Sequence, residues 1–201
     1  HSKSQNIANG LSEKELKKQI EQIRKLNDKN KKLTIFAGSE VDINLDGSLD
    51  FGDDILKELD FVFATIHSGL DDDSERNTNR ILKAMDNKYV HCIAHPTGRR
   101  IGEREPMKLD MEKIIRHAAD TKTMLEVNSN PYRLDLKDIH CKMAIEKGVT
   151  LVIGTDAHRK NDLEFMTLGV DTAARGWATK NDILNTRTAK QFEKFCKNLK
   201  K

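Results

Sequence analysis

The sequence has few cysteines, prolines and glycines for a chain of 201 residues. Its three cysteines form no CxxC pair, which excludes a disulfide framework and favours a reducing, cytoplasmic environment. Three prolines and eleven glycines exclude a low-complexity or linker-rich protein. No run of about 18 apolar residues occurs and no signal peptide opens the chain, so we expect no membrane partner.

The charge that is present is unevenly distributed, although the chain has the length of a single domain, residues 1–201. The net charge of +3 combines +5 in residues 1–35, −11 in residues 36–75 and +9 in the remainder. Basic flanks around an acidic segment fit a metal site that meets an anionic substrate. They also fit solvated helix faces beside an acidic loop.

Five apolar runs show little alternation between apolar and polar residues, which is typical of buried parallel strands. They cover residues 33–37, 61–66, 90–94, 124–127 and 149–154. Helical patterns separate them, and the last begins at Thr188 and should close the bottom of the fold. Ser12 and Glu15 form a capping box that starts an earlier helix. Strands that alternate with helices predict an α/β fold with a parallel sheet, and a sixth strand is expected at 168–172.

Polar residues end these five runs at intervals of 27, 28, 33 and 28 residues, each close to one βα unit. They are Glu40, His67, His95, Asn128 and Asp156. This spacing predicts that their side chains emerge on one rim of a barrel-like sheet, where such barrels carry their chemistry. An open sheet is the alternative, because only five or six strands can be counted.

Imidazole and carboxylate side chains along this rim form a ligand set for zinc, manganese or iron. The candidate ligands are His1, Glu40, His67, His95, Asp156 and His158. Asp156 and His158 are two residues apart at a strand end, so both side chains leave on the same side. Six ligands exceed what one four-coordinate ion requires, which predicts two or more ions. We expect His91, His117 and His140 to be structural or surface residues.

A multinuclear site can hold a hydroxide and clamp the oxygens of an in-line displacement at phosphorus. The sequence contains no GxSxG, P-loop or GxGxxG motif that would supply another chemistry. Arginines that follow the strand ends suit bidentate phosphate binding. The sequence therefore predicts phosphoester hydrolysis. The candidate catalytic residues are Glu40, His67, Asp156 and His158, and the candidate substrate-binding residues are Arg99, Arg133, Arg159 and Asn128.

Short stretches along nearly the whole chain carry a resemblance to a known family. They cover residues 1–2, 8–11, 38–43, 46–50, 64–68, 93–99, 102–106, 126–136, 155–158 and 174–177. Together they resemble the PHP (polymerase and histidinol phosphatase) domain, most closely the C-terminal PHP domain of bacterial family X DNA polymerases.

This resemblance implies a distorted (β/α)7, TIM-like barrel with up to three divalent metals. It assigns His1 to the family's Asp-His motif and Glu40 to its metal-bridging glutamate, with His67, His95, Asp156 and His158 as further ligands. It also implies a manganese-dependent 3′–5′ exonuclease that processes DNA ends or abasic sites in the bacterial cytoplasm. The implied partners are DNA and an N-terminal polymerase domain of the same parent chain.

One departure from the family pattern concerns the start of the chain. The family opens with a His-x-His strand and a further ligand before the position of His1, and this sequence has neither. We therefore expect the chain to begin inside the domain and to lack its first strands.

Three other functions stay open from the sequence. A stand-alone histidinol-phosphatase-like enzyme would use the same ligands, but the basic flanks and residues 102–106 and 174–177 favour the polymerase type. A non-catalytic interaction domain would leave DNA processing independent of Glu40 and Asp156. A metal-dependent amidohydrolase would need a lysine at a strand end for a carbamate bridge, and none is suitable.

Overall fold

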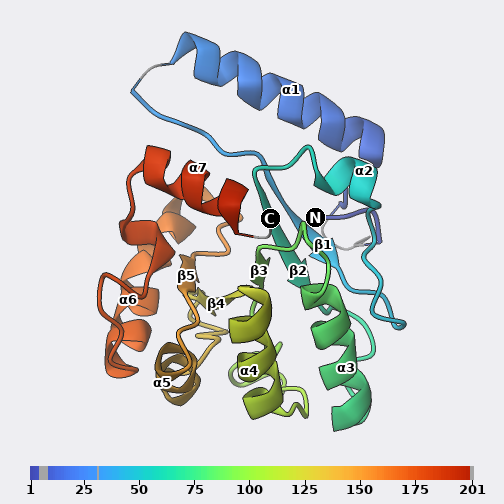
Figure 1. Cartoon of the computed structure of the whole chain (residues 1–201), viewed down its shortest axis with the longest axis vertical. Helices are drawn as coiled ribbons and strands as arrows, with labels where there is room; N and C mark the ends of the chain where they lie inside the picture. Colours follow the sequence, from blue (N-terminus) through green and yellow to red (C-terminus); the bar gives the residue numbers. More distant parts are fainter. Residues whose placement is uncertain (5–8, 31, 200–201) are drawn as a thin grey trace.

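The computed structural model describes residues 1–4, 9–30 and 32–199 and has a parallel five-stranded sheet at its centre (Figure 1). Of the stretches that carry the family resemblance, 8–11 begins with a residue outside the described part. The strands follow the chain in the order β1-β2-β3-β4-β5. The predicted parallel α/β sheet is confirmed, whereas a closed barrel is not: in the described part, β1 and β5 are the two edges. The strands are β1 (Gly38–Asp42), β2 (Phe61–Thr65), β3 (Cys92–Ile93), β4 (Met124–Asn128) and β5 (Leu151–Gly154).

Helices connect the strands and pack side by side, α3 against α4, α4 against α5 and α5 against α6 (Figure 1). The predicted capping box of Ser12 and Glu15 is present at the start of the first helix. Among the described residues, no helix combines the length and apolar character required to cross a bilayer. The α-helices are α1 (Glu13–Lys29), α2 (Asp53–Leu56), α3 (Ser74–Met85), α4 (Met111–Thr121), α5 (Asp138–Glu146), α6 (Met166–Arg175) and α7 (Ala189–Asn198), and η1 (Lys160–Phe165) and η2 (Leu184–Thr186) are 3-10 helices.

The final helix, α7, closes the end of the sheet at which the strands begin, as the sequence predicts. Its Cys196, together with Leu199 just beyond the helix, packs with Phe61, Cys92 and other residues at or near the amino ends of the strands. This small apolar cluster is separate from the larger core between the sheet and the outer helices. The opposite end of the sheet stays open for polar side chains.

Two strand predictions are wrong. The apolar run 33–37 precedes β1, because its backbone bonds to side chains: Asn27 exchanges two hydrogen bonds with Ile35, and the Asp60 carboxylate accepts from the Ala37 N–H. The expected strand 168–172 lies in α6. Gly169 packs that helix so closely that a Cβ there would lie 2.6 Å from the Ile153 side chain, so the segment covers β5 rather than pairing with it.

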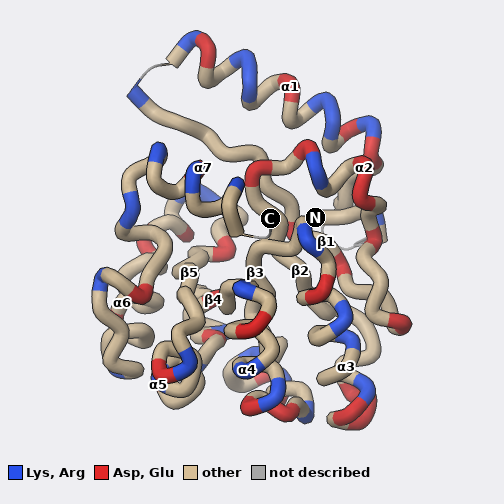
Figure 2. The backbone as a smooth tube through the Cα atoms, in the orientation of Figure 1, with Lys and Arg blue, Asp and Glu red and all other residues tan. Residues whose placement is uncertain are grey.

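The carboxyl ends of the strands meet at one rim, as predicted. Parallel pairing places Asp42 of β1 beside Thr65 of β2 and Asn128 of β4 beside Gly154 of β5. The acidic residues of 36–75 fall into two groups. Glu40 and Asp42 stand on β1, whereas others lie on the exposed turns and on α2 at the far end of the molecule (Figure 2).

Candidate metal centre

The carboxylate of Glu40, in the middle of β1, is the centre of the rim cluster. Its Oε1 lies 2.9 Å from His95 Nε2 and 3.6 Å from His67 Nε2, and its Oε2 lies 3.1 Å from His1 Nδ1. Ligand atoms of Glu40, His67 and His95 all lie within 4.8 Å of one another, close enough to hold one metal ion. Three of the predicted histidines therefore converge on the predicted glutamate.

His1 reaches this cluster because the start of the chain lies along the edge of β1. The Ser2 N–H donates to the Glu40 carbonyl at 2.9 Å, and the Ser2 hydroxyl accepts from the Asp42 N–H at 2.9 Å. Ser2 is fully buried. These bonds fix the backbone of the first residues, so the His1 imidazole is held over the Glu40 carboxylate.

The charges in this cluster favour an ionised carboxylate. Burial raises the pKa of Glu40, but the neighbouring imidazoles of His1, His95 and His67 outweigh burial and hold that pKa well below its usual range. In return, the Glu40 carboxylate raises the pKa of His1, although burial opposes the shift. The cluster thus presents a stable anion surrounded by imidazole nitrogens, which is an arrangement suited to a cation.

Asp42 orients the His67 ring by contacting the ring nitrogen that faces away from Glu40. Its Oδ1 lies 2.7 Å from His67 Nδ1, which leaves Nε2 directed at Glu40. A carboxylate on the far nitrogen of a ligating imidazole fixes the tautomer and the ring orientation. Asp42 is a site residue that was not predicted from the sequence. Its position two residues after Glu40 on one strand, and so on the same side, is the signal that could have identified it.

Asp156 and His158 approach the cluster from the other side of the rim. The His158 ring stacks on the His1 ring, with centroids 5.8 Å apart and an interplanar angle of 23°. His158 Nδ1–H donates to the Asp156 carbonyl at 2.8 Å. Asp156 and His95 both have a positive φ, at 52° and 27°. Such strained backbone is costly for residues other than glycine and clusters at functional sites.

A buried glutamate, Glu126 of β4, forms the floor beneath these groups. Its Oε2 accepts from the His95 N–H at 2.6 Å and from Asn128 Nδ2 at 3.4 Å. Burial raises the pKa of Glu126 to about 8, and the charges of Glu40 and Asp156 add to the shift. Asn128 Nδ2 also lies 3.3 Å from Asp156 Oδ2, so it links the floor to the rim. An acid within an otherwise apolar strand is the signal by which Glu126 could have been found.

The three candidate arginines occupy different environments. Arg133 Nε pairs with Asp156 Oδ2 at 3.2 Å, which places this arginine in the rim. Arg99 donates to the carbonyls of Arg133 and Leu134, so it holds the loop that carries Arg133. Arg159 is exposed at the start of η1, where its N–H donates to the Asp162 carboxylate at 2.9 Å.

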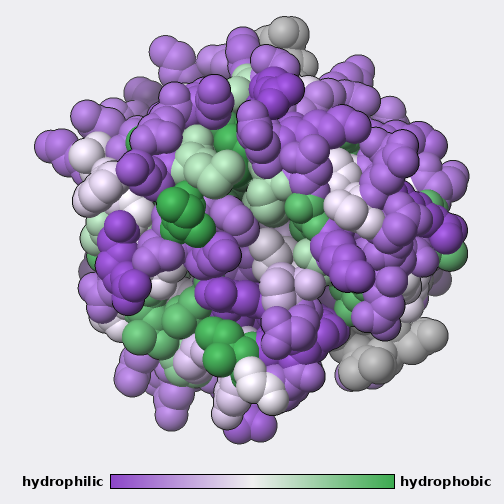
Figure 3. Space-filling model, turned by 90° about the horizontal axis from the view of Figure 1, so that it is seen from below, coloured by the Kyte–Doolittle hydropathy of each residue, from purple (hydrophilic) through white to green (hydrophobic). Residues whose placement is uncertain are grey.

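The histidines expected to have other roles lie away from this cluster. His91 Nδ1 accepts from the Val62 N–H at 3.1 Å, and His117 pairs with Asp86 at 2.8 Å on the surface of α4. His140 lies in the first turn of α5. The strands run downward in Figure 1, so Figure 3 looks onto the rim: this face is largely hydrophilic, with apolar side chains in separate groups.

No family model matches the chain, but individual known proteins are similar to it in sequence. The chain is 44% identical over 197 residues to the DNA polymerase/3′-5′ exonuclease PolX of Bacillus subtilis, a match that covers 98% of the chain and 35% of that protein. It is 32% identical over 178 residues to a probable phosphatase of Thermoanaerobacter sp., covering 84% of the chain and 70% of the relative. The chain belongs to the PHP family.

PHP membership confirms the resemblance seen in the sequence. A probable phosphatase of Caldicellulosiruptor bescii is another relative, 32% identical over 142 residues. The chain spans 35% of the length of the Bacillus subtilis relative and 55% of the Caldicellulosiruptor bescii one.

The donor set of this PHP chain fits a divalent metal. Glu40, His67 and His95 supply a carboxylate and two imidazoles within coordination range of a common point. Nitrogen and oxygen donors of this kind suit zinc, manganese and iron. Asp42 supplies the outer carboxylate that imidazole ligands of metals commonly have.

Proposed function

We propose that this PHP chain hydrolyses DNA phosphodiester bonds as a metal-dependent 3′–5′ exonuclease that processes DNA ends or abasic sites. Its family places it among phosphoester hydrolases, and the resemblance to PolX supports DNA as the substrate. The proposed partners are DNA and an N-terminal polymerase domain of the same parent protein, in the bacterial cytoplasm and nucleoid. The observation that carries the proposal is the convergence of three imidazoles on the Glu40 carboxylate.

The residues of the rim would hold up to three divalent ions, manganese, zinc or iron. Glu40, His67 and His95 form the best-defined group, and His1 joins it to Asp156 and His158. Bound divalent metals supply positive charge for phosphoryl oxygens and an activated water for in-line attack.

The protein's own side chains set the charge of the site and the orientation of its ligands. The low pKa of Glu40 keeps it ionised, as an anion to which a cation can bind. Glu126 holds the His95 backbone beneath the rim through the His95 N–H. Asp42 fixes the ring of His67, so that ligand needs no reorientation when a cation binds.

Arg133 is the residue best placed to bind a substrate phosphate. Its Nε is held by Asp156 at the rim, and 16% of its side chain is exposed. A guanidinium in this position can donate charge-assisted hydrogen bonds to a phosphate oxygen from its remaining N–H groups.

The test is digestion of a 3′-labelled oligonucleotide with Mn²⁺, combined with elemental analysis of bound metal. We expect Glu40→Gln and Asp156→Asn to lose orders of magnitude in hydrolysis, and Glu40→Gln also to lose bound metal. Glu75→Gln is the matched control, because Glu75 is exposed on α3. Near-normal hydrolysis by Glu40→Gln would contradict the proposal.

A stand-alone small-molecule phosphatase is the alternative. It is supported by the chain's coverage of 70% of the probable phosphatase of Thermoanaerobacter sp.. The two functions differ in the substrate that is turned over. Efficient turnover of histidinol phosphate with no digestion of DNA would favour the alternative and overturn the exonuclease proposal.

A further inference from the structure

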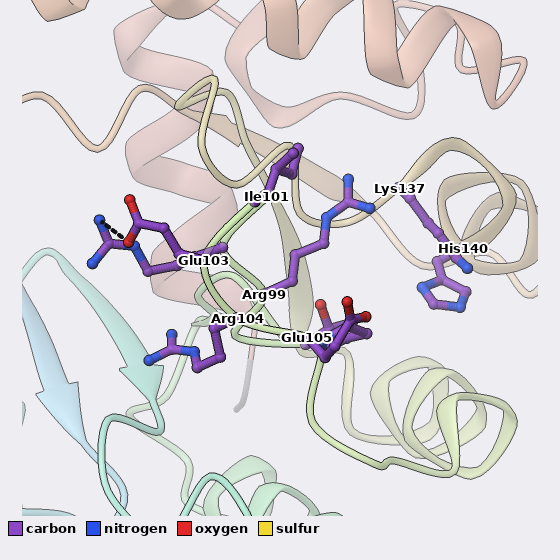
Figure 4. A pocket seen from close by; sticks show the side chains of 11 residues that line it. Arg99, Ile101, Glu103, Arg104, Glu105, Lys137 and His140 are labelled. Carbon is purple, nitrogen blue, oxygen red and sulfur yellow. Dashed lines mark ion pairs between the residues drawn. The ribbon is translucent and has the colours of Figure 1, made fainter.

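A cavity of about 560 Å³ opens between the loop after β3 and the first turn of α5 (Figure 4). Its volume lies in the range of sites that bind small ligands. It contains none of the candidate metal ligands, so it is separate from the metal centre. The loop 97–106 forms most of its wall, and Lys137 and His140 complete it.

Arg99 and Lys137 give this wall a positive charge, and neither makes an ion pair in the described part of the chain. In Figure 4, Arg99 reaches toward the base of the Lys137 side chain, and Lys137 extends along the cavity wall toward His140. Arg99 is fixed by its bonds to backbone carbonyls. His140 lies beside Arg99 and Lys137 and is neutral, because burial lowers its pKa to about 4. Arg99 and Lys137 therefore offer donors and positive charge to an anion.

The acidic residues of the cavity do not cancel this charge. Glu103 is paired with Arg100 at 3.0 Å, on the side away from Lys137 in Figure 4. Arg104 donates to the Gly98 carbonyl, so it braces the loop. Glu105 lies at the lower edge of the cavity in Figure 4. The lining carries three arginines and one lysine against two glutamates, a net positive charge.

Two exposed apolar side chains, Ile101 and Tyr132, form an apolar edge on the loops of this cavity. The Ile101 N–H donates to the Tyr132 carbonyl at 2.7 Å, which joins the cavity loop to the loop that precedes Arg133. Both side chains are unusually exposed for their size, Ile101 at 47% and Tyr132 at 58%. An exposed aromatic side chain on a loop joined to the wall of a cationic groove is a feature on which bases of single-stranded nucleic acid can stack.

We infer that this cavity and its apolar edge bind a nucleotide of single-stranded DNA next to the scissile bond, with a base on Tyr132 and Ile101 and a phosphate at Lys137 and Arg99. Arg133 follows Tyr132 in the chain and pairs with Asp156 of the rim, so one strand could contact both sites. This inference rests on the proposed function, since it names how that function's substrate is held.

The test is binding of a 5′-fluorescein oligothymidylate to the 201-residue chain in EDTA, measured by fluorescence anisotropy at several salt concentrations. Loss of one phosphate contact should reduce the salt slope by about one in Lys137→Ala. Loss of stacking should weaken binding about tenfold in Tyr132→Ala, and Tyr132→Phe should restore it. Lys147→Ala is the matched control, because Lys147 is exposed at the other end of α5.

The outcomes separate this inference from the proposed function. If Lys137→Ala and Tyr132→Ala bind as tightly as Lys147→Ala, the subsite is wrong even if the chain digests DNA. If they bind more weakly while the unaltered chain fails to digest DNA with Mn²⁺, the exonuclease proposal fails and the subsite stands. Far-ultraviolet circular dichroism checks each fold, and Lys137→Arg, which keeps the charge, should retain the salt slope.

Discussion

Gly154 of β5 lies directly against Glu126 of β4, so that a Cβ at Gly154 would stand 2.1 Å from Glu126 Oε1. No side chain can approach a buried carboxylate oxygen so closely. Glycine at 154 therefore leaves the space in which the Glu126 side chain lies beneath the rim. Because Glu126 also accepts the His95 N–H, this glycine indirectly sets the position of a candidate metal ligand.

Gly154→Ala should destabilise the chain by about 1–3 kcal/mol, the usual cost of overpacking a buried site. It should also lower metal affinity, because a displaced Glu126 releases the His95 backbone. Urea unfolding measures the first effect. In a Glu126→Ala background, the same substitution should cost much less, since the colliding oxygens are gone. Equal costs in both backgrounds would show that the contact with Glu126 is not the cause.

Asp42→Asn should weaken metal binding about 10- to 100-fold, because the neutral amide holds His67 less firmly in the tautomer that points Nε2 at Glu40. Competition with a chelator measures this affinity directly. Asp54→Asn is a matched control, because Asp54 is exposed on α2. If Asp42→Asn loses stability but keeps full metal affinity, Asp42 is a structural residue and does not position His67.

The sequence was sufficient for the order of the five strands and for the rim, but not for the segment 168–172, which is a helix and not a sixth strand. The intervals between Glu40, His67, His95 and Asp156 match the length of whole βα units. The strand ends of such units lie at one edge of a parallel sheet. Strand limits depend on partners distant in the chain. Residues 33–37 are apolar enough to form a strand, yet Asn27 and Asp60 satisfy much of their backbone.

Long-range contacts also explain the residues that were missed. Glu126 is part of the site because parallel pairing sets β4 beside β5, with Gly154 against it, and the His95 N–H happens to face its carboxylate. Pairing of this kind cannot be derived from one sequence without the register. The segment 168–172 was wrongly predicted to be a strand because its fold also depends on a distant contact. Gly169 allows this segment, as part of a helix, to pack closely on the sheet.

Arg80→Met should destabilise the chain by about 3 kcal/mol, because it leaves several buried acceptors without a donor. Arg80 is 2% exposed, and its guanidinium donates to the carbonyls of Ile43, Asn44 and Ser68. Arg80→Lys should recover only part of this loss, since one ammonium cannot reach three carbonyls that a planar guanidinium spans. Urea unfolding of both variants checks the order, and equal stability of Arg80→Met and the unaltered chain would contradict it.

Acid should destabilise the chain through His140. Burial lowers the pKa of His140 to about 4, and Lys137 and Arg99 add to the shift. The unfolded chain, with an ordinary histidine pKa near 6.5, binds a proton that the folded chain does not bind between about pH 6.5 and pH 4. Stability should therefore fall as the pH falls through this window. His140→Gln should flatten the dependence there in urea unfolding, and an unchanged slope would show that His140 is protonated normally.

Arg133→Ala should raise KM for an oligonucleotide about tenfold and lower kcat much less, because the lost group would bind a phosphate and not the reacting atoms. Arg133→Lys should recover part of the loss, since it keeps the charge but not the fork of donors. Arg116→Ala is the control, because Arg116 is an exposed arginine on α4 paired with Glu112. Arg133 also contacts Asp156, so the kinetic pattern is decisive. A fall in kcat with unchanged KM would mean that Arg133 serves to brace Asp156 and that the substrate phosphate is held elsewhere.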